Sequence, residues 1–353
     1  MRRVQKGYTI IEVMIALTLS LLLTAGLTQI FVSNSRTFNV TEASARTQET
    51  GRLALSVLSR EIRNADYWGC QGTNFLENVV NLLNDDPDFD INSLTEGGLR
   101  AENGVGPSGS DRLILGGLAA NSAVKVTKQP SVNSASLQVS DPDQFSQNDI
   151  LIVTNCARAH MFQVTNDPTT GNSQVVIHNE GNVSAGPGNA EKDIEPSYND
   201  NPEGASVFRP RFQRFYLKDN VNTGRRELVI DGIAVLGGAG ANLGTYSTTL
   251  ALFEDVQDFQ VELGYRNGPS DVVSGWSAPE NAAVSNLEDR TIAVRVSILV
   301  RSPDDGVTEG GQSFCYPGWL DCANDANLLT TVDADDTFLY RVYTTTATLR
   351  NRI

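Results

Sequence analysis

The chain has little of what most catalytic and nucleic-acid-binding sites are built from. Its 353 residues include two histidines, His160 and His178, and its 27 lysine and arginine residues face 42 aspartate and glutamate residues, for a net charge of −15. Phosphate binding depends on clustered basic side chains, so this balance argues against nucleic acid as a partner. Neither histidine has a second metal ligand at a suitable spacing, and we expect both to be structural.

Common catalytic and cofactor motifs are also missing. The sequence has no Gly-x-Ser-x-Gly elbow and no Gly-Lys-Ser/Thr phosphate loop. We therefore expect no catalytic residues, no cofactor and no enzymatic activity. The acidic stretch 85–92 has carboxylates at alternate positions, but Ile91 stands where a calcium loop needs Gly, and Gly97 where it needs Glu. We expect a solvated loop rather than a metal site, although the sequence leaves calcium binding there open.

Proline is missing from the first 86 residues, and charge is missing from Val13 to Val32. At about 1.5 Å rise per residue, the uncharged run spans roughly 30 Å, the thickness of the hydrocarbon core of a bilayer. Farther on, Ala54, Leu58 and Ile62 recur on one helical face among polar residues. Without proline the helix can continue unbroken, so we predict one helix of roughly 58 residues, apolar first and amphipathic afterwards.

Basic residues before the apolar run fix its expected orientation. Arg2, Arg3 and Lys6 favour a cytoplasmic N-terminus, which sends the rest of a bacterial chain into the periplasm or outside. A cleavable secretory signal is the alternative, with an apolar region of roughly 7 to 15 residues and a small-residue cleavage site. Here the apolar helix continues well past Ala25 and Gly26, which favours a segment that stays attached.

One acid, Glu12, stands near the start of this apolar run, five residues after Gly7. The helix dipole would make an anion tolerable there, but it does not account for the surrounding pattern. That pattern, MRRVQKG followed by YTIIEV, resembles the class III signal of type IV pilins and pseudopilins. The resemblance implies that a membrane-embedded prepilin peptidase cuts after Gly7 and methylates the new amino terminus at Tyr8. Glu12 is then the assembly residue, because its carboxylate can pair with the Tyr8 amine of a neighbouring subunit in a low-dielectric environment.

After Tyr67 the composition changes to short runs rich in Val, Ile and Thr, separated by Gly, Pro, Asn and Asp. This pattern predicts an antiparallel β domain. Its candidate strands include DRLILGGL, AVKVTK, SLQVS, DILIVTN, MFQVT, QVVIH, FQVELGY, TIAVRVSILVRS and FLYRVYTTTATLR. The expected fold is α+β, a long N-terminal helix packed on a large antiparallel β-rich globular domain. Its parts are a leader (1–7), a transmembrane or filament-core helix (8–32), an amphipathic half (33–66) and the β-rich domain (67–353).

Four cysteines in a translocated domain predict two disulfides. Cys315 and Cys322 enclose a turn with proline and glycine, which favours a local bridge and leaves Cys70 to pair with Cys156. A zinc site is the alternative, but no Cys-x-x-Cys pair is present.

The C-terminal third carries a second resemblance. The segments LFEDVQDFQVELGY, TIAVRVSILVRS and YRVYTTTATLRNR are similar to the PilW family of type IV pilus minor pilins, relatives of the J-type pseudopilins. This resemblance implies a non-enzymatic subunit that primes pilus assembly with other minor pilins and the major pilin. It also implies a place in the pilus tip beside a PilY-type adhesin, and a role in adhesion and twitching motility. Before assembly the subunit would reside in the inner membrane, with its globular domain in the periplasm.

Two other functions remain open. A J-type pseudopilin of type II secretion would use the same helix and acid to build a short pseudopilus, although the long domain here favours the pilus. A membrane-anchored periplasmic enzyme is the third and weakest reading.

Overall fold

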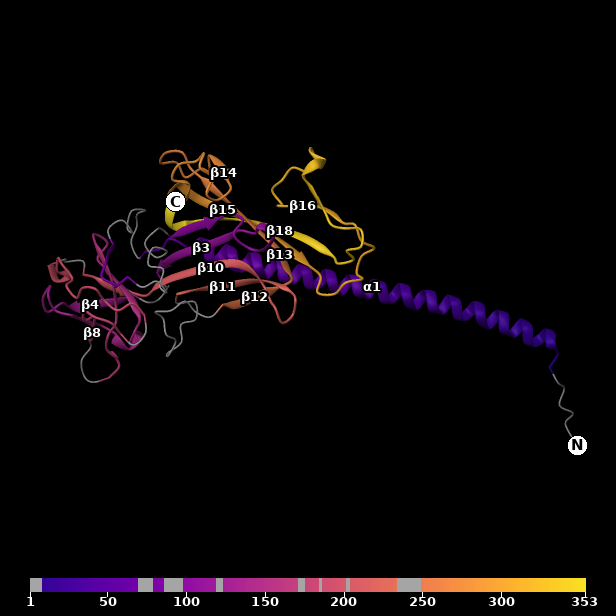
Figure 1. Cartoon of the computed structure of the whole chain (residues 1–353), viewed down its shortest axis with the longest axis horizontal. Coiled ribbons are helices and arrows are strands. Elements are labelled where there is room, and N and C mark those ends of the chain that lie inside the picture. The colour runs from indigo at the N-terminus through magenta and orange to yellow at the C-terminus, as the bar shows by residue number, and fades with distance from the viewer. Residues whose placement is uncertain are drawn as a thin grey trace, which may run out of the picture.

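The computed structural model describes residues 8–68, 79–85, 98–118, 123–170, 175–183, 186–200, 204–233 and 249–353. One long helix, α1 (Ile10–Asn64), projects from a β-rich body (Figure 1). Its first half stands clear of the body, and its second half lies against the strands. The helix passes through Gly26 without a break. The predicted fold, a long N-terminal apolar helix followed by a large antiparallel β-rich domain, is confirmed.

Two antiparallel sheets hold the second half of α1. The five-stranded sheet has the order β12-β11-β10-β3-β2, and the four-stranded sheet the order β14-β13-β15-β18. The strands of the first are β2 (Leu99–Glu102), β3 (Arg112–Leu118), β10 (Pro210–Asp219), β11 (Arg226–Ile233) and β12 (Leu250–Glu254). Those of the second are β13 (Val256–Tyr265), β14 (Gly275–Ser277), β15 (Thr291–Arg301) and β18 (Tyr340–Thr348). The short helix α3 (Leu287–Arg290) leads into β15.

A third, seven-stranded sheet lies at the end of the molecule away from the N-terminus of α1 (Figure 1). Its order is β1-β7-β6-β9-β4-β5-β8, and only β1 and β7 pair in parallel. Its strands are β1 (Val79–Asn81), β4 (Val124–Lys128), β5 (Ser136–Val139), β6 (Ile150–Thr154), β7 (Ala159–Gln163), β8 (Val175–Ile177) and β9 (Ser206–Phe208). All but β1 come between β3 and β10, where Leu118 pairs with Pro210. The sheet is therefore largely an insertion between two neighbouring strands.

The main core forms where α1 meets the first two sheets. Ala54, Leu58 and Ile62 are four residues apart, so they share one face of α1, and all three are almost fully buried. They pack with apolar side chains of both sheets, among them Phe215 and Phe259. Burying one such leucine or isoleucine contributes about 1.5–3 kcal/mol, so this face fixes the helix to the domain.

The C-terminal residues of the chain secure the end of α1. The Asn351 side-chain amide donates to the Ala65 carbonyl (2.8 Å), and Arg352 Nε donates to Asp66 Oδ2 (2.5 Å). The other Asp66 oxygen accepts from the indole N–H of Trp68 (2.7 Å). The side chains of Asp66 and Arg352 are only 8% and 5% exposed, so each charge depends on the other. The first and last elements of the body are thereby joined at one point.

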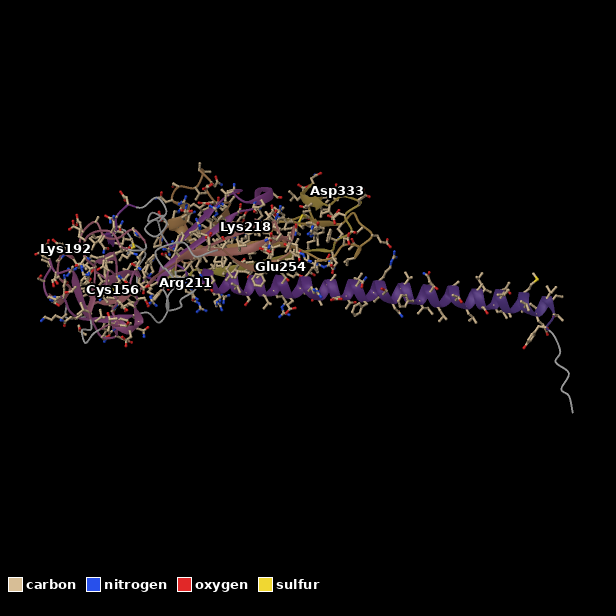
Figure 2. The ribbon with its side chains drawn as sticks, turned by 60° about the horizontal axis from the view of Figure 1, so that its bottom comes forward. Cys156, Lys192, Arg211, Lys218, Glu254 and Asp333 are labelled. Atoms are coloured by element: carbon tan, nitrogen blue, oxygen red, sulfur yellow. A yellow bond between two sulfur atoms is a disulfide. The ribbon has the colours of Figure 1, made fainter. Side chains whose placement is uncertain are left out.

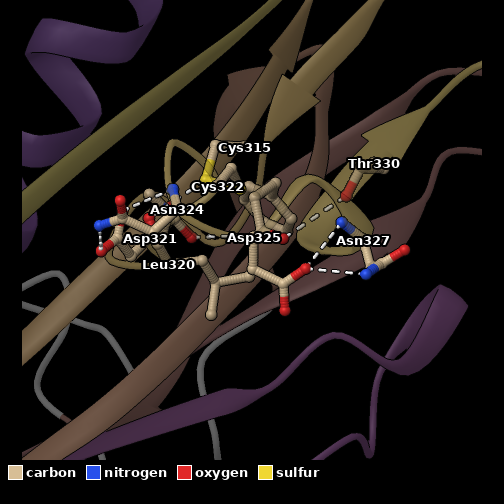
Figure 3. Close-up of a disulfide and its surroundings, with 11 residues drawn as sticks. Cys315, Leu320, Asp321, Cys322, Asn324, Asp325, Asn327 and Thr330 are labelled. Carbon is tan, nitrogen blue, oxygen red and sulfur yellow. Dashed lines mark hydrogen bonds between the residues drawn. A yellow bond between two sulfur atoms is a disulfide. The ribbon is translucent and has the colours of Figure 1, made fainter.

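A disulfide between Cys315 and Cys322 closes a loop beside the hairpin of β16 (Ser313–Cys315) and β17 (Leu329–Thr331) (Figure 3). The expectation that the chain holds a disulfide is confirmed. Next to the bridge, Asn324 donates to Asp321 and Asn327 donates to Asp325, which shapes the following turns. Cys156 is also disulfide-bonded. Its expected partner, Cys70, lies outside the described residues, so the Cys70–Cys156 pairing stays a prediction.

The disulfide loop is anchored on the outer face of the four-stranded sheet. The backbone N–H of Gly318 donates to the Ser297 hydroxyl (3.0 Å). The guanidinium of Arg295 lies between two tryptophan rings, 4.6 Å from the Trp276 centroid and 4.9 Å from that of Trp319. Trp319 belongs to the loop and Trp276 to β14, so one arginine holds two segments together.

Close packing of α1 on β18 leads to a first prediction. Gly51 lies so near the Tyr343 ring that an added Cβ would sit 2.3 Å from a ring carbon. Gly51→Leu should therefore push the helix off the sheet and lower the free energy of unfolding by about 2–3 kcal/mol. Chemical denaturation of the full-length protein in detergent measures this. Arg52→Leu, which adds the same side chain at an exposed position, is the control and should change stability little; equal stability of both variants would contradict the packing.

His178 leads to a second prediction, on pH. Its ring is fully buried and packs on Phe162, with ring centroids 4.8 Å apart. Burial, with a smaller contribution from the nearby His160, lowers the pKa of His178 to about 4. In the unfolded chain a histidine titrates near pH 6.5, so below that pH the unfolded state binds a proton that the folded state excludes.

The folded protein should accordingly lose stability as the pH falls from 6.5 to about 4, by up to roughly 1.4 kcal/mol per pH unit from this residue. The His178→Leu variant should show a shallower loss over the same range. Denaturation curves of both proteins at pH 7, 5.5 and 4.5 give the free energy of unfolding at each pH. Groups that titrate in both proteins contribute equally, so the difference between the two profiles reports on His178. Parallel pH profiles would show that His178 does not titrate in this way.

Candidate assembly site at the helix N-terminus

Thr9 and Glu12 form a capping box at the start of α1. Thr9 is the N-cap, in an extended conformation (φ −81°, ψ 152°), and its hydroxyl oxygen accepts from the Glu12 backbone N–H (3.2 Å). In return, Glu12 Oε2 accepts from the Thr9 backbone N–H and from the Thr9 hydroxyl, both at 2.9 Å. Two of the N–H groups that a helix start leaves unpaired are satisfied in this way.

The two oxygens of the Glu12 carboxylate differ in their hydrogen bonding. Oε2 takes both capping bonds, whereas Oε1 accepts no hydrogen bond within the part of the chain described. The helix dipole also favours the negative charge at this end. Glu12 can therefore close the first turn of its own helix and still offer an oxygen to another cation.

The other predicted site residues lie around this box. The Tyr8 side chain is 88% exposed at the end of the described helix segment. Gly7 lies outside the described residues. Sequence reasoning missed Thr9, although Thr-x-x-Glu before an apolar run is the sequence signature of a capping box.

The first half of α1 has no partner within the chain. Every residue from Tyr8 to Glu42 is exposed, and Ala43 is the first buried one. Figure 2 shows the side chains of this half standing clear of the body. Among the described residues it is the one helix long and apolar enough to cross a membrane. An apolar surface of this size requires a cover, which a membrane or neighbouring helices can supply.

Threonine hydroxyls in this half are satisfied inside the helix. The hydroxyls of Thr18, Thr24 and Thr28 donate to the carbonyls of Ile15, Ser20 and Thr24 at 2.9, 2.8 and 2.8 Å. A polar group without a partner is costly in lipid. These bonds let the segment carry hydroxyls without needing external acceptors.

Two family models match the chain. Residues 2–28 match the prokaryotic N-terminal methylation motif, which covers most of the predicted leader, the capping box and most of the apolar run. Residues 214–351 match the model described as type IV pilus-assembly protein W, PilW. The chain carries a PilW domain. This domain runs from within β10 to the C-terminal turn, so it contains the four-stranded sheet and the disulfide loop.

The seven-stranded sheet lies between the two matched regions. No curated protein and no solved structure matches the chain.

Together, the PilW domain and the methylation motif support a type IV pilus minor pilin anchored in a membrane. The PilW family consists of structural pilins and is not a known enzyme family. Together the two matches imply contacts with other pilus components and with a prepilin peptidase. In the described residues, no group of three or more His, Cys, Asp or Glu side chains could hold a metal ion. The acidic stretch 85–92 falls outside them except for Asp85.

The capping box gives a third prediction. Thr9→Val removes the hydroxyl that accepts from the Glu12 N–H, so the first turn of α1 should fray. Hydrogen exchange of the backbone amides of the first turn, measured in detergent micelles, should become at least about fivefold faster. Thr9→Ser keeps the hydroxyl and serves as the control, with exchange close to that of the native protein. Unchanged exchange in Thr9→Val would mean that the turn does not depend on this cap.

Proposed function

We propose that the chain is a minor pilin that helps to prime type IV pilus assembly and forms part of the pilus tip complex. The observation that carries this proposal is the apolar half of α1, which is exposed along its whole length yet rigidly continuous with a folded domain. Such a helix suits a subunit that is stored in the inner membrane and then withdrawn into a bundle of similar helices. Its partners are then the other minor pilins and the major pilin.

Removal of the leader would create a charged amine next to the capping box. In this proposal a prepilin peptidase cuts after Gly7 and methylates Tyr8, which leaves a positively charged amine one residue before the N-cap. The amine of one subunit binds the free Oε1 of Glu12 on its neighbour, while Oε2 keeps its capping bonds. Opposite charges attract strongly away from water, so this pair favours assembled over separate subunits.

The position of the seven-stranded sheet supports a place at the tip. It lies at the end of the subunit farthest from the start of α1 (Figure 1), so it points away from the cell when the helix is aligned with the fibre. It also falls outside both matched regions. We propose that the tip complex includes a PilY-type adhesin and that the subunit thereby supports adhesion and twitching motility.

A J-type pseudopilin of type II secretion would use the same N-terminal chemistry. The match of residues 214–351 to the PilW model favours the pilus.

The fourth prediction tests the role of Glu12. Glu12→Gln keeps the shape and the capping acceptor but removes the charge, so the Tyr8 amine of the neighbour loses its counter-ion. Incorporation into pili should fall by roughly a hundredfold, while membrane insertion and leader cleavage stay nearly unchanged. Immunoblots of sheared pili and of inner membranes measure the two pools side by side.

Asp271→Asn is the control, because Asp271 is an exposed acid on a loop far from α1 in the sequence and pairs only with Arg266 in the described structure. It should enter pili at the native level. If Glu12→Gln protein also does so, the carboxylate serves only as a helix cap and the pairing proposal is wrong.

A further inference from the structure

The dipeptide Asn-Gly occurs twice in the sequence, as Asn103 followed by Gly104 and as Asn267 followed by Gly268. In this dipeptide the glycine nitrogen can attack the asparagine side-chain amide, because glycine has no side chain to hinder the approach. Both pairs are exposed, the first on the loop between β2 and β3 and the second on the loop between β13 and β14. The sequence alone gives no reason to expect different reactivity at the two sites.

A hydrogen bond holds the nitrogen of the first pair. The Gly104 N–H donates to Asp111 Oδ1 (2.9 Å), and Asp111 is 1% exposed. The other oxygen of this carboxylate accepts from the Val261 backbone N–H (2.8 Å), so Asp111 is fixed between the start of β3 and β13. Before Gly104 could attack Asn103, this bond would have to break and the proton that the carboxylate stabilises would have to leave. Hydrogen bonds to charged groups are the stronger ones, so this site is protected.

The nitrogen of the second pair is not held in this way. Within the described residues the Gly268 N–H donates to no acceptor, and both Asn267 and Gly268 are exposed. The Asn267 backbone N–H donates to the Ser274 hydroxyl (2.9 Å), which fixes the start of the loop. The next nitrogen along the chain, which is the one that reacts, is open to solvent.

A guanidinium is bonded to the side-chain carbonyl of Asn267, where Arg290 Nη2 donates to Oδ1. Arg290 is itself fixed, since its Nε donates to the Arg266 carbonyl (3.0 Å) and its Nη1 to the Ser285 carbonyl (3.1 Å). Its guanidinium also lies 5.2 Å from the Tyr265 ring centroid. A fixed, charged donor at this oxygen draws electrons from Cγ and stabilises the negative charge that develops on the oxygen when Cγ is attacked.

We propose that Asn267 is a site of spontaneous deamidation, in which Gly268 is the nucleophile and Arg290 stabilises the charge that develops on Oδ1. The Gly268 nitrogen loses its proton to solvent base and forms a bond to Asn267 Cγ. The bond between Cγ and Nδ2 breaks, and ammonia leaves. Water then opens the resulting succinimide to aspartate or isoaspartate, so the overall change is the hydrolysis of an amide and requires only water.

The product differs from the native loop in charge and in length. A new carboxylate lies beside Arg290, and isoaspartate adds a methylene group to the backbone between β13 and β14. The loop belongs to the region matched to the PilW model. The reaction depends on the fold of this region and not on the proposed role in pili.

Peptide mapping of the full-length protein in detergent tests the proposal. Native protein and protein unfolded in guanidinium chloride are incubated at the same mildly alkaline pH, and mass spectrometry follows the conversion of Asn103 and Asn267 to aspartate and isoaspartate. In the unfolded chain the two asparagines should react at similar rates. In the native protein Asn267 should react at least about tenfold faster than Asn103, because Gly104 must first lose its bond to a charged group. Equal rates, faster conversion of Asn103 or no conversion of Asn267 in the native protein would overturn the proposal.

Arg290→Gln tests the contribution of the guanidinium. Conversion of Asn267 in this variant should fall about tenfold, as expected for the loss of a charged donor. Asn103 is the internal control, since loss of the fold would free Gly104 and accelerate its reaction. Arg290→Lys keeps a charged donor and should convert Asn267 faster than Arg290→Gln does. If Asn103 stays slow while all three proteins convert Asn267 at the same rate, the assignment of Arg290 is wrong.

Discussion

An apolar helix surface that the chain cannot bury by itself is the constraint on which the rest of the structure depends. From Tyr8 to Glu42 no side chain of α1 is covered by the described body. The sequence of this half fits such a surface, since its threonine hydroxyls bond within the helix and the acid at its start, Glu12, is bonded to the N-cap. A segment of this kind is stable in a bilayer or against other helices, and in water it would aggregate. Anchoring, processing and assembly all concern what covers it.

The other half of α1 is fixed on the globular domain. Small and apolar residues on one face, Ala54, Leu58 and Ile62, enter the core, and Gly51 lets the Tyr343 ring approach the helix backbone. At its end, Arg352 and Asp66 form a buried pair. A helix held along several turns cannot pivot freely, so the direction of the exposed half is set by the domain. The seven-stranded sheet is consequently held at the opposite end (Figure 1).

The basic side chains of the domain are largely engaged within it. Arginine outnumbers lysine 22 to 5, and many arginines pair with a carboxylate, stack on an aromatic ring or do both, as Arg295 does with Glu262 and two tryptophans. The planar guanidinium suits this double use better than an ammonium group does. Arg301 follows the same rule, with its guanidinium 4.1 Å from the Phe338 ring centroid. With a net charge of −15, the chain keeps an acidic balance outside these contacts.

Local patterns were enough to predict the helix and the longer strands. The apolar run, the absence of proline and the four-residue repeat gave α1, and alternating Val, Ile and Thr gave strands such as β3, β6, β15 and β18. Strands of three residues, such as β9, β14 and β16, carry too little pattern and exist because a partner strand lies beside them.

The division into three sheets and the parallel pairing of β1 with β7 depend on contacts between distant segments. At the N-terminus, the sequence pattern singled out Glu12, whose assembly role stays a prediction, and the Thr-x-x-Glu signature could have predicted the capping role of Thr9. The hollow between α1 and β12, which Arg301 of β15 also lines, joins distant segments and has no local sequence pattern.

The central claim is that a leader precedes α1 in the precursor and that the processed helix lies in a fibre after assembly. Mass spectrometry of the chain tests this claim most directly. The chain is isolated separately from inner membranes and from sheared pili, and its N-terminal peptide is sequenced. The account predicts a chain that starts at N-methylated Tyr8 in pili, and the same processed species as the main form in the membrane. A chain in pili that retains residues 1–7, or one cut beyond the apolar run so that α1 loses its exposed half, would contradict it.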